Sequence, residues 1–277
     1  MENERKIEQE AGGFPTWSNL LVIVALFFAG SLVAAIVMAV LRLAWADAPK
    51  EFLTAIMYAT QFGLAIWWVW LYGRRRGARS AFNFTFRWYN STIVLLGLVL
   101  MLAGSVVLEP LLGLFPDKYF DMMNEAIGSG GWAILTAVVL APVCEEMLFR
   151  GLILEYIKQK RGVAVAVVLS ALIFGLVHAP ILPQMVNAFV LGIMLGYVYV
   201  LTGSLVSVII VHAANNALSY LIMELTGGQS AELRDILGND PLFWTIFGAS
   251  VVVFIGAVVA MALVATKNRH IEGNINR

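Results

Sequence analysis

Long apolar stretches separated by short polar connections run along almost the whole chain. A helix that crosses a bilayer needs about 20 predominantly apolar residues. Eight segments approach this length, and the pattern predicts helices over residues 18–42, 52–73, 91–115, 131–157, 163–180, 184–202, 204–225 and 242–266. The fifth to seventh segments are joined by connections of only a few residues, so we expect them to be antiparallel neighbours.

The composition agrees with this pattern. Of the 277 residues, 60% are hydrophobic and 13% are charged, whereas soluble domains contain about 25% charged residues. The formal net charge of zero gives no indication of a nucleic-acid partner, and the single cysteine excludes an internal disulfide. The prediction is an all-α, polytopic membrane helix bundle of about eight transmembrane helices. We expect an integral, multi-pass protein, which lies in the cell membrane if the chain is prokaryotic. Its expected partner is the lipid bilayer, and we expect no nucleic-acid partner.

Basic residues predict the orientation of the bundle. Most of the 18 lysines and arginines fall on one side if the N-terminus is cytoplasmic, and cytoplasmic loops carry the excess of basic residues. Both termini are therefore expected in the cytoplasm. We expect no soluble domain, only a cytoplasmic tail over 1–17, a transmembrane bundle over 18–266 and a second cytoplasmic tail over 267–277.

Three charges interrupt the fourth apolar segment, in the sequence VVLAPVCEEMLFRGLIL. A charge near the centre of a spanning helix costs about 2.5–3.5 kcal/mol on insertion scales. Glu146 and Arg150 lie four residues apart, so they share a helix face and are expected to pair. Glu145 points about 100° away and has no partner within its own helix. Pro142, one turn earlier, should bend this helix. The alternative to a functional site is a buried charge cluster that only locks helix packing.

Three more polar side chains lie at a similar depth on other helices. His178 ends one apolar run, and His212 and Asn216 share one face of another. At 1.5 Å per residue, the glutamates lie roughly 18 Å, His178 roughly 24 Å and His212 roughly 13 Å from the cytoplasmic helix ends. Each histidine alone would be typical of an interhelical hydrogen bond. Together with the glutamates, they predict one polar layer near the middle of the bilayer.

This set of side chains suits the activation of a water molecule. A carboxylate in a pocket of low dielectric constant can act as a general base or acid. His212 and Asn216 could donate hydrogen bonds to an oxyanion that forms when a carbonyl is attacked. Two imidazoles and a carboxylate are also a common catalytic zinc set. The spacing of these residues does not choose between the two chemistries.

Three ordered motifs then make the resemblance specific. They are EExxxR (Glu145, Glu146 and Arg150), FxxxH (Phe174 and His178) and HxxxN (His212 and Asn216). Over residues 131–225, the expected catalytic core, the chain resembles the CPBP family of intramembrane proteases, which includes the type II CAAX prenyl endopeptidases and bacteriocin self-immunity proteins. The resemblance implies that Glu145 and His178 activate the water. It also implies that His212 and Asn216 hold the oxyanion or a metal.

The resemblance implies an endopeptidase that depends either on a metal or on a glutamate. Its substrate would be a membrane-associated peptide or protein, which is prenylated in the best-known members of the family. Its cofactor would be one divalent metal (zinc) held by Glu145, His178 and His212, or no metal. We expect Glu145 to face His178 across the bundle. The alternatives are a non-proteolytic scaffold or bacteriocin-immunity protein on the same fold, and a proton- or ion-coupled transporter. Buried Glu and His are typical of transporters, but the chain lacks the two similar halves that many of them have.

Overall fold

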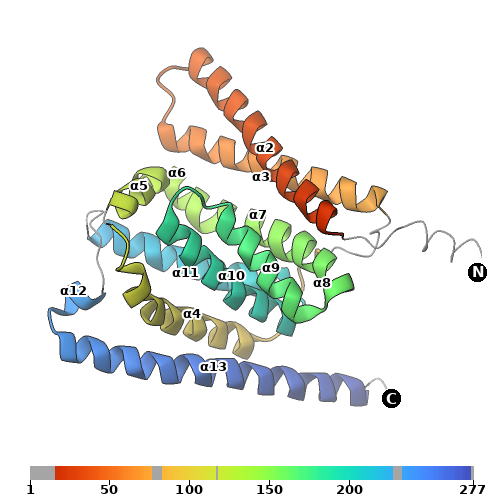
Figure 1. Cartoon of the computed structure of the whole chain (residues 1–277), viewed down its shortest axis with the longest axis vertical. Helices are drawn as coiled ribbons and strands as arrows, with labels where there is room; N and C mark the ends of the chain where they lie inside the picture. Colours follow the sequence, from red (N-terminus) through yellow and green to blue (C-terminus); the bar gives the residue numbers. More distant parts are fainter. Residues whose placement is uncertain (1–15, 77–82, 117, 227–232, 276–277) are drawn as a thin grey trace, which may run out of the picture.

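The computed structural model describes residues 16–76, 83–116, 118–226 and 233–275, and within these ranges the chain is helical and has no strand (Figure 1). This confirms the predicted all-α fold. The elements in chain order are α2 (Trp17–Ala44), α3 (Lys50–Arg75), α4 (Ser91–Leu112), α5 (Lys118–Ile127), α6 (Gly131–Ile134), η1 (Leu135–Leu140), α7 (Ala141–Glu146), η2 (Met147–Leu154), α8 (Glu155–Arg161), α9 (Val163–Leu176), α10 (Leu182–Thr202), α11 (Leu205–Leu225), α12 (Leu233–Leu237) and α13 (Asp240–Ile275).

Seven helices in the described part of the chain are long and apolar enough to cross a membrane, which confirms a multi-pass integral membrane protein. The fifth predicted span, residues 163–180, is shorter than expected: α9 has only 14 residues and is therefore about 21 Å long. The turn that follows α9 contains Pro180, and α10 has Pro183 in its first turn. Neither proline can donate the backbone hydrogen bond that would continue α9.

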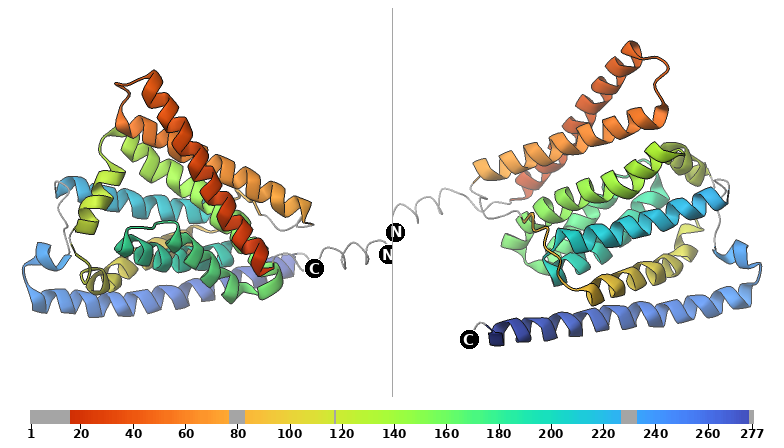
Figure 2. Two further views of the ribbon diagram at one scale, coloured as in Figure 1. Left: turned by 45° about the horizontal axis from the view of Figure 1, so that its top comes forward. Right: turned by 180° about the vertical axis from the view of Figure 1, so that it is seen from behind.

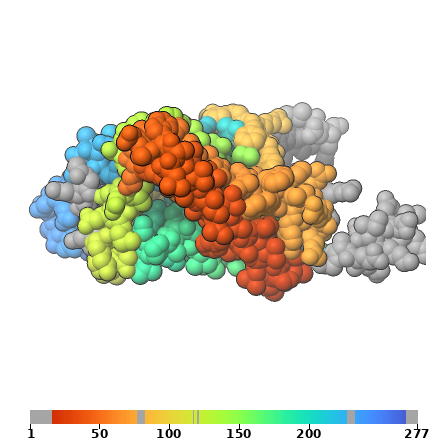
Figure 3. Space-filling view, turned by 90° about the horizontal axis from the view of Figure 1, so that it is seen from above, coloured from red at the N-terminus to blue at the C-terminus, as the bar shows by residue number. Residues whose placement is uncertain are grey.

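The helices form a layered bundle (Figure 1, Figure 2). The α2–α3 hairpin covers one side, where α3 packs against η1, α7 and η2, and α13 covers the opposite side, where it packs along α4. Helix α2 runs across the outer face of the molecule (Figure 3). Its outward side chains include Leu21, 73% exposed, and Leu43, 88% exposed. This apolar surface is the one expected to face lipid.

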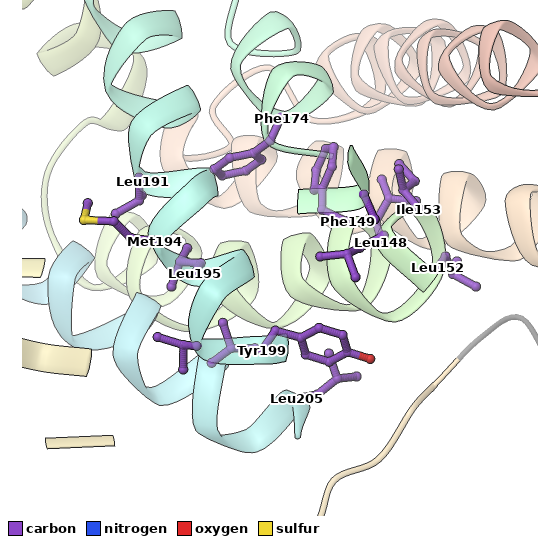
Figure 4. Close-up of a cluster of buried hydrophobic side chains, with 14 of the residues drawn as sticks. Leu148, Phe149, Leu152, Ile153, Phe174, Leu191, Met194, Leu195, Tyr199 and Leu205 are labelled. Carbon is purple, nitrogen blue, oxygen red and sulfur yellow. The ribbon is translucent and has the colours of Figure 1, made fainter. Parts of the chain in front are cut away.

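The interior is built mainly from η2, α9, α10 and α11 (Figure 4). Helices α9 and α10 approach closely at two glycines, Gly192 and Gly196, whose GxxxG spacing lets a second helix come near. A Cβ atom added at Gly192 would lie 2.9 Å from the Cβ of Ala171, and one at Gly196 would lie 3.0 Å from Val167. These small residues bring the two backbones together and fix the position of Phe174, which lies on α9 beside Ala171.

The connection between α10 and α11 shows why these helices are antiparallel neighbours. Helix α10 ends at Gly203, whose φ of +60° is a left-handed conformation that favours glycine. The side chain of Ser204 then accepts a hydrogen bond from the backbone N–H of Ser207 and caps α11. A two-residue reversal of this kind confirms the tight connection predicted from the sequence.

The start of α2 and the end of α13 lie at the same end of the bundle (Figure 2). An even number of crossings would place both ends on one side of a membrane, so the eighth crossing expected from the sequence would have to be made by the short helix α9. Which side is cytoplasmic stays a prediction, as do the boundaries drawn at residues 17 and 266. Of the expected N-terminal tail, residues 1–15 lie outside the described part of the chain.

Candidate active site

The two glutamates lie on a helix with unusual geometry. Glu145 and Glu146 end the short α-helix α7, which stands between two π-helical segments, η1 and η2. Such π-helical turns occur frequently at functional sites, because the extra residue re-aims the side chains around it. The sequence predicted only a disturbance at Pro142, so the π-helical turns on both sides of the glutamates are a finding of the structure.

Pro142 and Asn216 are linked through a backbone carbonyl. In the π-helical frame the N–H of Ala141 bonds the carbonyl of Thr136, and the next residue, Pro142, has no N–H for the carbonyl of Ala137. The amide Nδ2 of Asn216 on α11 donates to that carbonyl at 2.9 Å. One amide hydrogen of Asn216 is therefore used to join α11 to η1, and its second hydrogen remains for another acceptor.

Glu146 and Arg150 form the predicted pair within one helix. The Arg150 Nη1 donates to Glu146 Oε1 at 2.8 Å, and both side chains are fully buried. The other guanidinium nitrogen, Nη2, donates to the backbone carbonyl of Gly192 at 3.0 Å. The guanidinium carbon also lies 5.0 Å from the ring centroid of Phe174, a cation–π contact. Arg150 thus joins the glutamate-bearing helix to both α9 and α10.

His212 lies between the two glutamates. Its Nδ1 is 2.8 Å from Glu146 Oε1, and its Nε2 is 3.6 Å from Glu145 Oε2. Because a carboxylate can only accept, Nδ1 carries the hydrogen of the shorter contact. The Nε2 of a neutral His212 ring is then an acceptor, and on a protonated ring it is a donor directed at Glu145. The Nε2 of His212 thus faces Glu145 Oε2 at a distance longer than a hydrogen bond.

Glu145 has a second partner that the sequence did not reveal. The hydroxyl of Tyr58 on α3 donates a hydrogen bond to Glu145 Oε1. Glu145 is only 6% exposed, and its two oxygens face different helices, one toward α3 and the other toward α11. Tyr58 belongs to none of the three motifs and is one of several aromatic residues of its span, so its chemistry could not have been singled out from its position in the sequence.

His178 lies differently from the expectation. It follows α9 in a turn instead of extending the helix, and it is half-buried. Its Nδ1 bonds the backbone carbonyl of Phe174 at 2.7 Å, so Nδ1 carries the hydrogen and Nε2 is the free acceptor. Between the described side chains of His178 and Glu145 there is no ion pair or hydrogen bond. His212 is the imidazole that the structure places close to Glu145, at 3.6 Å, and the expectation that Glu145 faces His178 stays a prediction.

Phe174 nevertheless brings the two histidines into one site. Its ring meets the His178 ring edge-on at 4.9 Å and the His212 ring edge-on at 6.1 Å between centroids. It also meets Phe149 of η2 at 4.9 Å (Figure 4). One buried aromatic ring thus forms an apolar wall between the imidazoles. The structure brings Glu145, Glu146, Arg150 and His212 into direct contact, and it places His178 and Asn216 at the edges of this cluster.

The residues that would hold the predicted zinc are Glu145, His178 and His212. In the part of the chain that the structure describes, no three His, Cys, Asp or Glu side chains lie together as a group that could hold a metal ion. The Nδ1 nitrogens of the two histidines are bonded to Glu146 and to a backbone carbonyl, an arrangement that leaves each Nε2 for a ligand and is also common in metal sites. The predicted zinc therefore stays a prediction, and the chemistry below is derived from the protein side chains alone.

Fold and site together define a class: a multi-pass integral membrane protein with a buried centre of carboxylates and imidazoles contributed by separate helices. Residues 128–218 match the family model described as "Type II CAAX prenyl endopeptidase Rce1-like". The match contains all three motifs and supports the resemblance to a family of membrane proteases that they indicate. No curated protein and no solved structure matches the chain.

Proposed function

We propose that this protein is an intramembrane endopeptidase in which Glu145 activates water to hydrolyse a peptide bond. The observation that carries the proposal is the environment of that carboxylate. A buried charge in a membrane helix is costly, yet Glu145 contacts a hydroxyl and an imidazole instead of an arginine or lysine. Glu146, in contrast, has Arg150 as its ion-pair partner. Among the residues that the structure describes, no arginine or lysine forms an ion pair with Glu145, and such a carboxylate is suited to accept a proton.

The substrate class follows from the family and from the depth of the site. We propose a membrane-associated peptide or protein, and a prenylated cysteine near the scissile bond is the first feature to test. A prenyl chain would place the peptide at the bilayer, where the buried glutamates can be reached from the membrane. An unmodified transmembrane peptide is the second class to test.

The hydrolysis would proceed in two stages. Oε2 of Glu145 takes a proton from water as the water oxygen attacks the carbonyl carbon, so that the carbonyl oxygen becomes an oxyanion. The C–N bond then breaks, and the proton passes from Glu145 to the leaving amine. The products are a carboxylic acid and an amine, and the carboxylate of Glu145 is regenerated.

The hydrogen-bond partners of the two histidines give them different roles. His178 has its Nδ1 hydrogen on a backbone carbonyl, so its Nε2 can accept a hydrogen from the same water and orient it. His212 has its Nδ1 hydrogen on Glu146, and a protonated His212 ring would donate from Nε2 to the oxyanion. The second amide hydrogen of Asn216 provides another donor for that oxygen. We therefore propose Glu145 and His178 for water activation, with His212 and Asn216 for the oxyanion.

The test uses the full chain, purified in detergent. The probes are an internally quenched peptide with a farnesylated cysteine three residues from its C-terminus, the same peptide without the farnesyl group, and apolar transmembrane peptides. Glu145→Gln and His178→Ala should each abolish cleavage in a folded protein, because glutamine keeps the size of glutamate but cannot take a proton. Asn216→Ala should retain a slow rate, about 10²–10³-fold below the wild type, as is typical when one oxyanion donor is lost.

Two results would separate the remaining possibilities. If Glu145→Gln cleaves nearly as fast as the wild type, the glutamate is structural and the proposed site is wrong. Each assay is repeated after dialysis against a chelator. A loss of cleavage that zinc restores would add a metal to the site, whereas unchanged cleavage would support a mechanism based on the side chains alone.

A further inference from the structure

We propose that Tyr58 is a positioning residue for Glu145, so that the α2–α3 hairpin completes the active site. This inference rests on the proposed role of Glu145 as the general base. Tyr58 lies on α3, outside the segment of residues 128–218 that matches the family model. Its hydroxyl nevertheless donates a hydrogen bond to Glu145 Oε1, and the imidazole of His212 lies 3.6 Å from the other carboxylate oxygen.

The geometry assigns different roles to the two oxygens of Glu145. Oε1 accepts the hydrogen of Tyr58, whereas Oε2 faces His212 Nε2 at 3.6 Å. A phenol donates one hydrogen without adding a charge, so it fixes the plane of the carboxylate and leaves Oε2 free to accept a proton. Without the Tyr58 hydroxyl, the carboxylate could rotate, and either oxygen could turn toward His212. A small loss of alignment at a reacting group can cost a large factor in rate.

The Tyr58 ring is itself held in place by aromatic packing. It stacks on the ring of Phe62, one turn further along α3, with centroids 4.5 Å apart and planes 20° apart. Phe62 is buried and meets Phe27 of α2 edge-on at 5.4 Å. The position of the hydroxyl is therefore set by contacts within the hairpin, and little side-chain freedom is lost when it bonds Glu145.

The test compares Tyr58→Phe with Tyr72→Phe, each of which removes one hydroxyl from α3 and keeps the ring. The Tyr72 hydroxyl accepts a hydrogen bond from Asn19 at 2.8 Å and belongs to no part of the proposed site. On the farnesylated peptide, Tyr58→Phe should lower kcat by about 10- to 100-fold, the range typical when the partner that orients a reacting ligand is removed. KM should change by less than about twofold, since catalysis and not binding is affected. Tyr72→Phe should leave kcat unchanged.

A thermal-unfolding cycle tests the same contact without any substrate. The unfolding midpoint is measured for the wild type, Tyr58→Phe, Glu145→Ala and the double variant. If the hydroxyl acts on Glu145, the effect of Tyr58→Phe should be clearly smaller in the Glu145→Ala background than in the wild type. The proposal would be overturned if the midpoint shifts of Tyr58→Phe and Glu145→Ala simply added in the double variant. It would also be overturned if the wild type cleaves a probe and Tyr58→Phe has the same kcat. If the wild type cleaves none of the probes but the cycle shows coupling, the positioning contact stands and the proposed function fails.

Discussion

Arg150 offers the sharpest test of the buried charge network. Replacing it with alanine removes the 2.8 Å bond to Glu146, the 3.0 Å bond to the Gly192 carbonyl and the contact with Phe174. Glu146 is then a buried carboxylate with His212 as its remaining hydrogen-bond partner. Its Oε2 atom already has no partner in the part of the chain that the structure describes.

The magnitude follows from that loss. Breaking a buried ion pair by removing one partner costs about 3–5 kcal/mol, whereas whole proteins are stable by about 5–15 kcal/mol. Arg150→Ala should therefore lower the unfolding midpoint strongly and reduce the amount of protein in the membrane, in addition to its activity. The double variant Glu146→Gln with Arg150→Met should recover most of the stability, because it leaves no uncompensated charge.

The chain supplies its own reporter for this experiment. Its single cysteine, Cys144, is half-buried and directly precedes the glutamates. A thiol-reactive fluorogenic dye would thus report the unfolding of this helix as the detergent-purified protein is heated. Arg234→Ala is the control, because its pair with Asp240 is exposed and such pairs are worth about 0–1 kcal/mol. The reasoning is refuted if Arg150→Ala melts no earlier than the Arg234→Ala control.

Two further predictions concern backbone contacts. Asn216→Ala should lower the unfolding midpoint as well as the cleavage rate, because it leaves the carbonyl of Ala137 without its 2.9 Å donor. A reduced cleavage rate at an unchanged midpoint would contradict the link between Asn216 and η1. Gly192→Ala should destabilise the protein by about 1–3 kcal/mol through overpacking, since the new Cβ would lie 2.9 Å from Ala171. Gly248→Ala, where a Cβ meets open space, should leave the midpoint unchanged or raised, and equal effects at the two glycines would refute the packing argument.

The sequence predicted well those features that depend on local periodicity. The helical spans follow from runs of apolar residues, and the pairing of Glu146 with Arg150 follows from a separation of four residues on one helix. The tight connection at Gly203 and the close approach at Gly192 also follow from local chemistry. In each case the relevant geometry is contained within one helix or one turn.

Features that depend on the relative placement of helices could not be predicted in the same way. Tyr58 and Glu145 are 87 residues apart, and no spacing rule connects them. The expectation for His178 used a straight helix, but Pro180 belongs to a turn that redirects the chain. The π-helical turns around the glutamates have no sequence pattern beyond Pro142. Which imidazole faces Glu145 was therefore a question of tertiary structure.

The partners of the two glutamates also imply an order for biogenesis. As the chain is synthesised, Tyr58 precedes Glu145 by 87 residues, and Arg150 follows Glu146 by only four. When the fourth span enters the membrane, the partner of Glu145 has therefore already been synthesised, and the partner of Glu146 is synthesised almost at once. His212 contacts both but is made 66 residues after Glu146. The charged span can therefore be inserted with its cost partly offset, and the arrival of α11 brings the last side chain of the cluster into a membrane-embedded helix assembly.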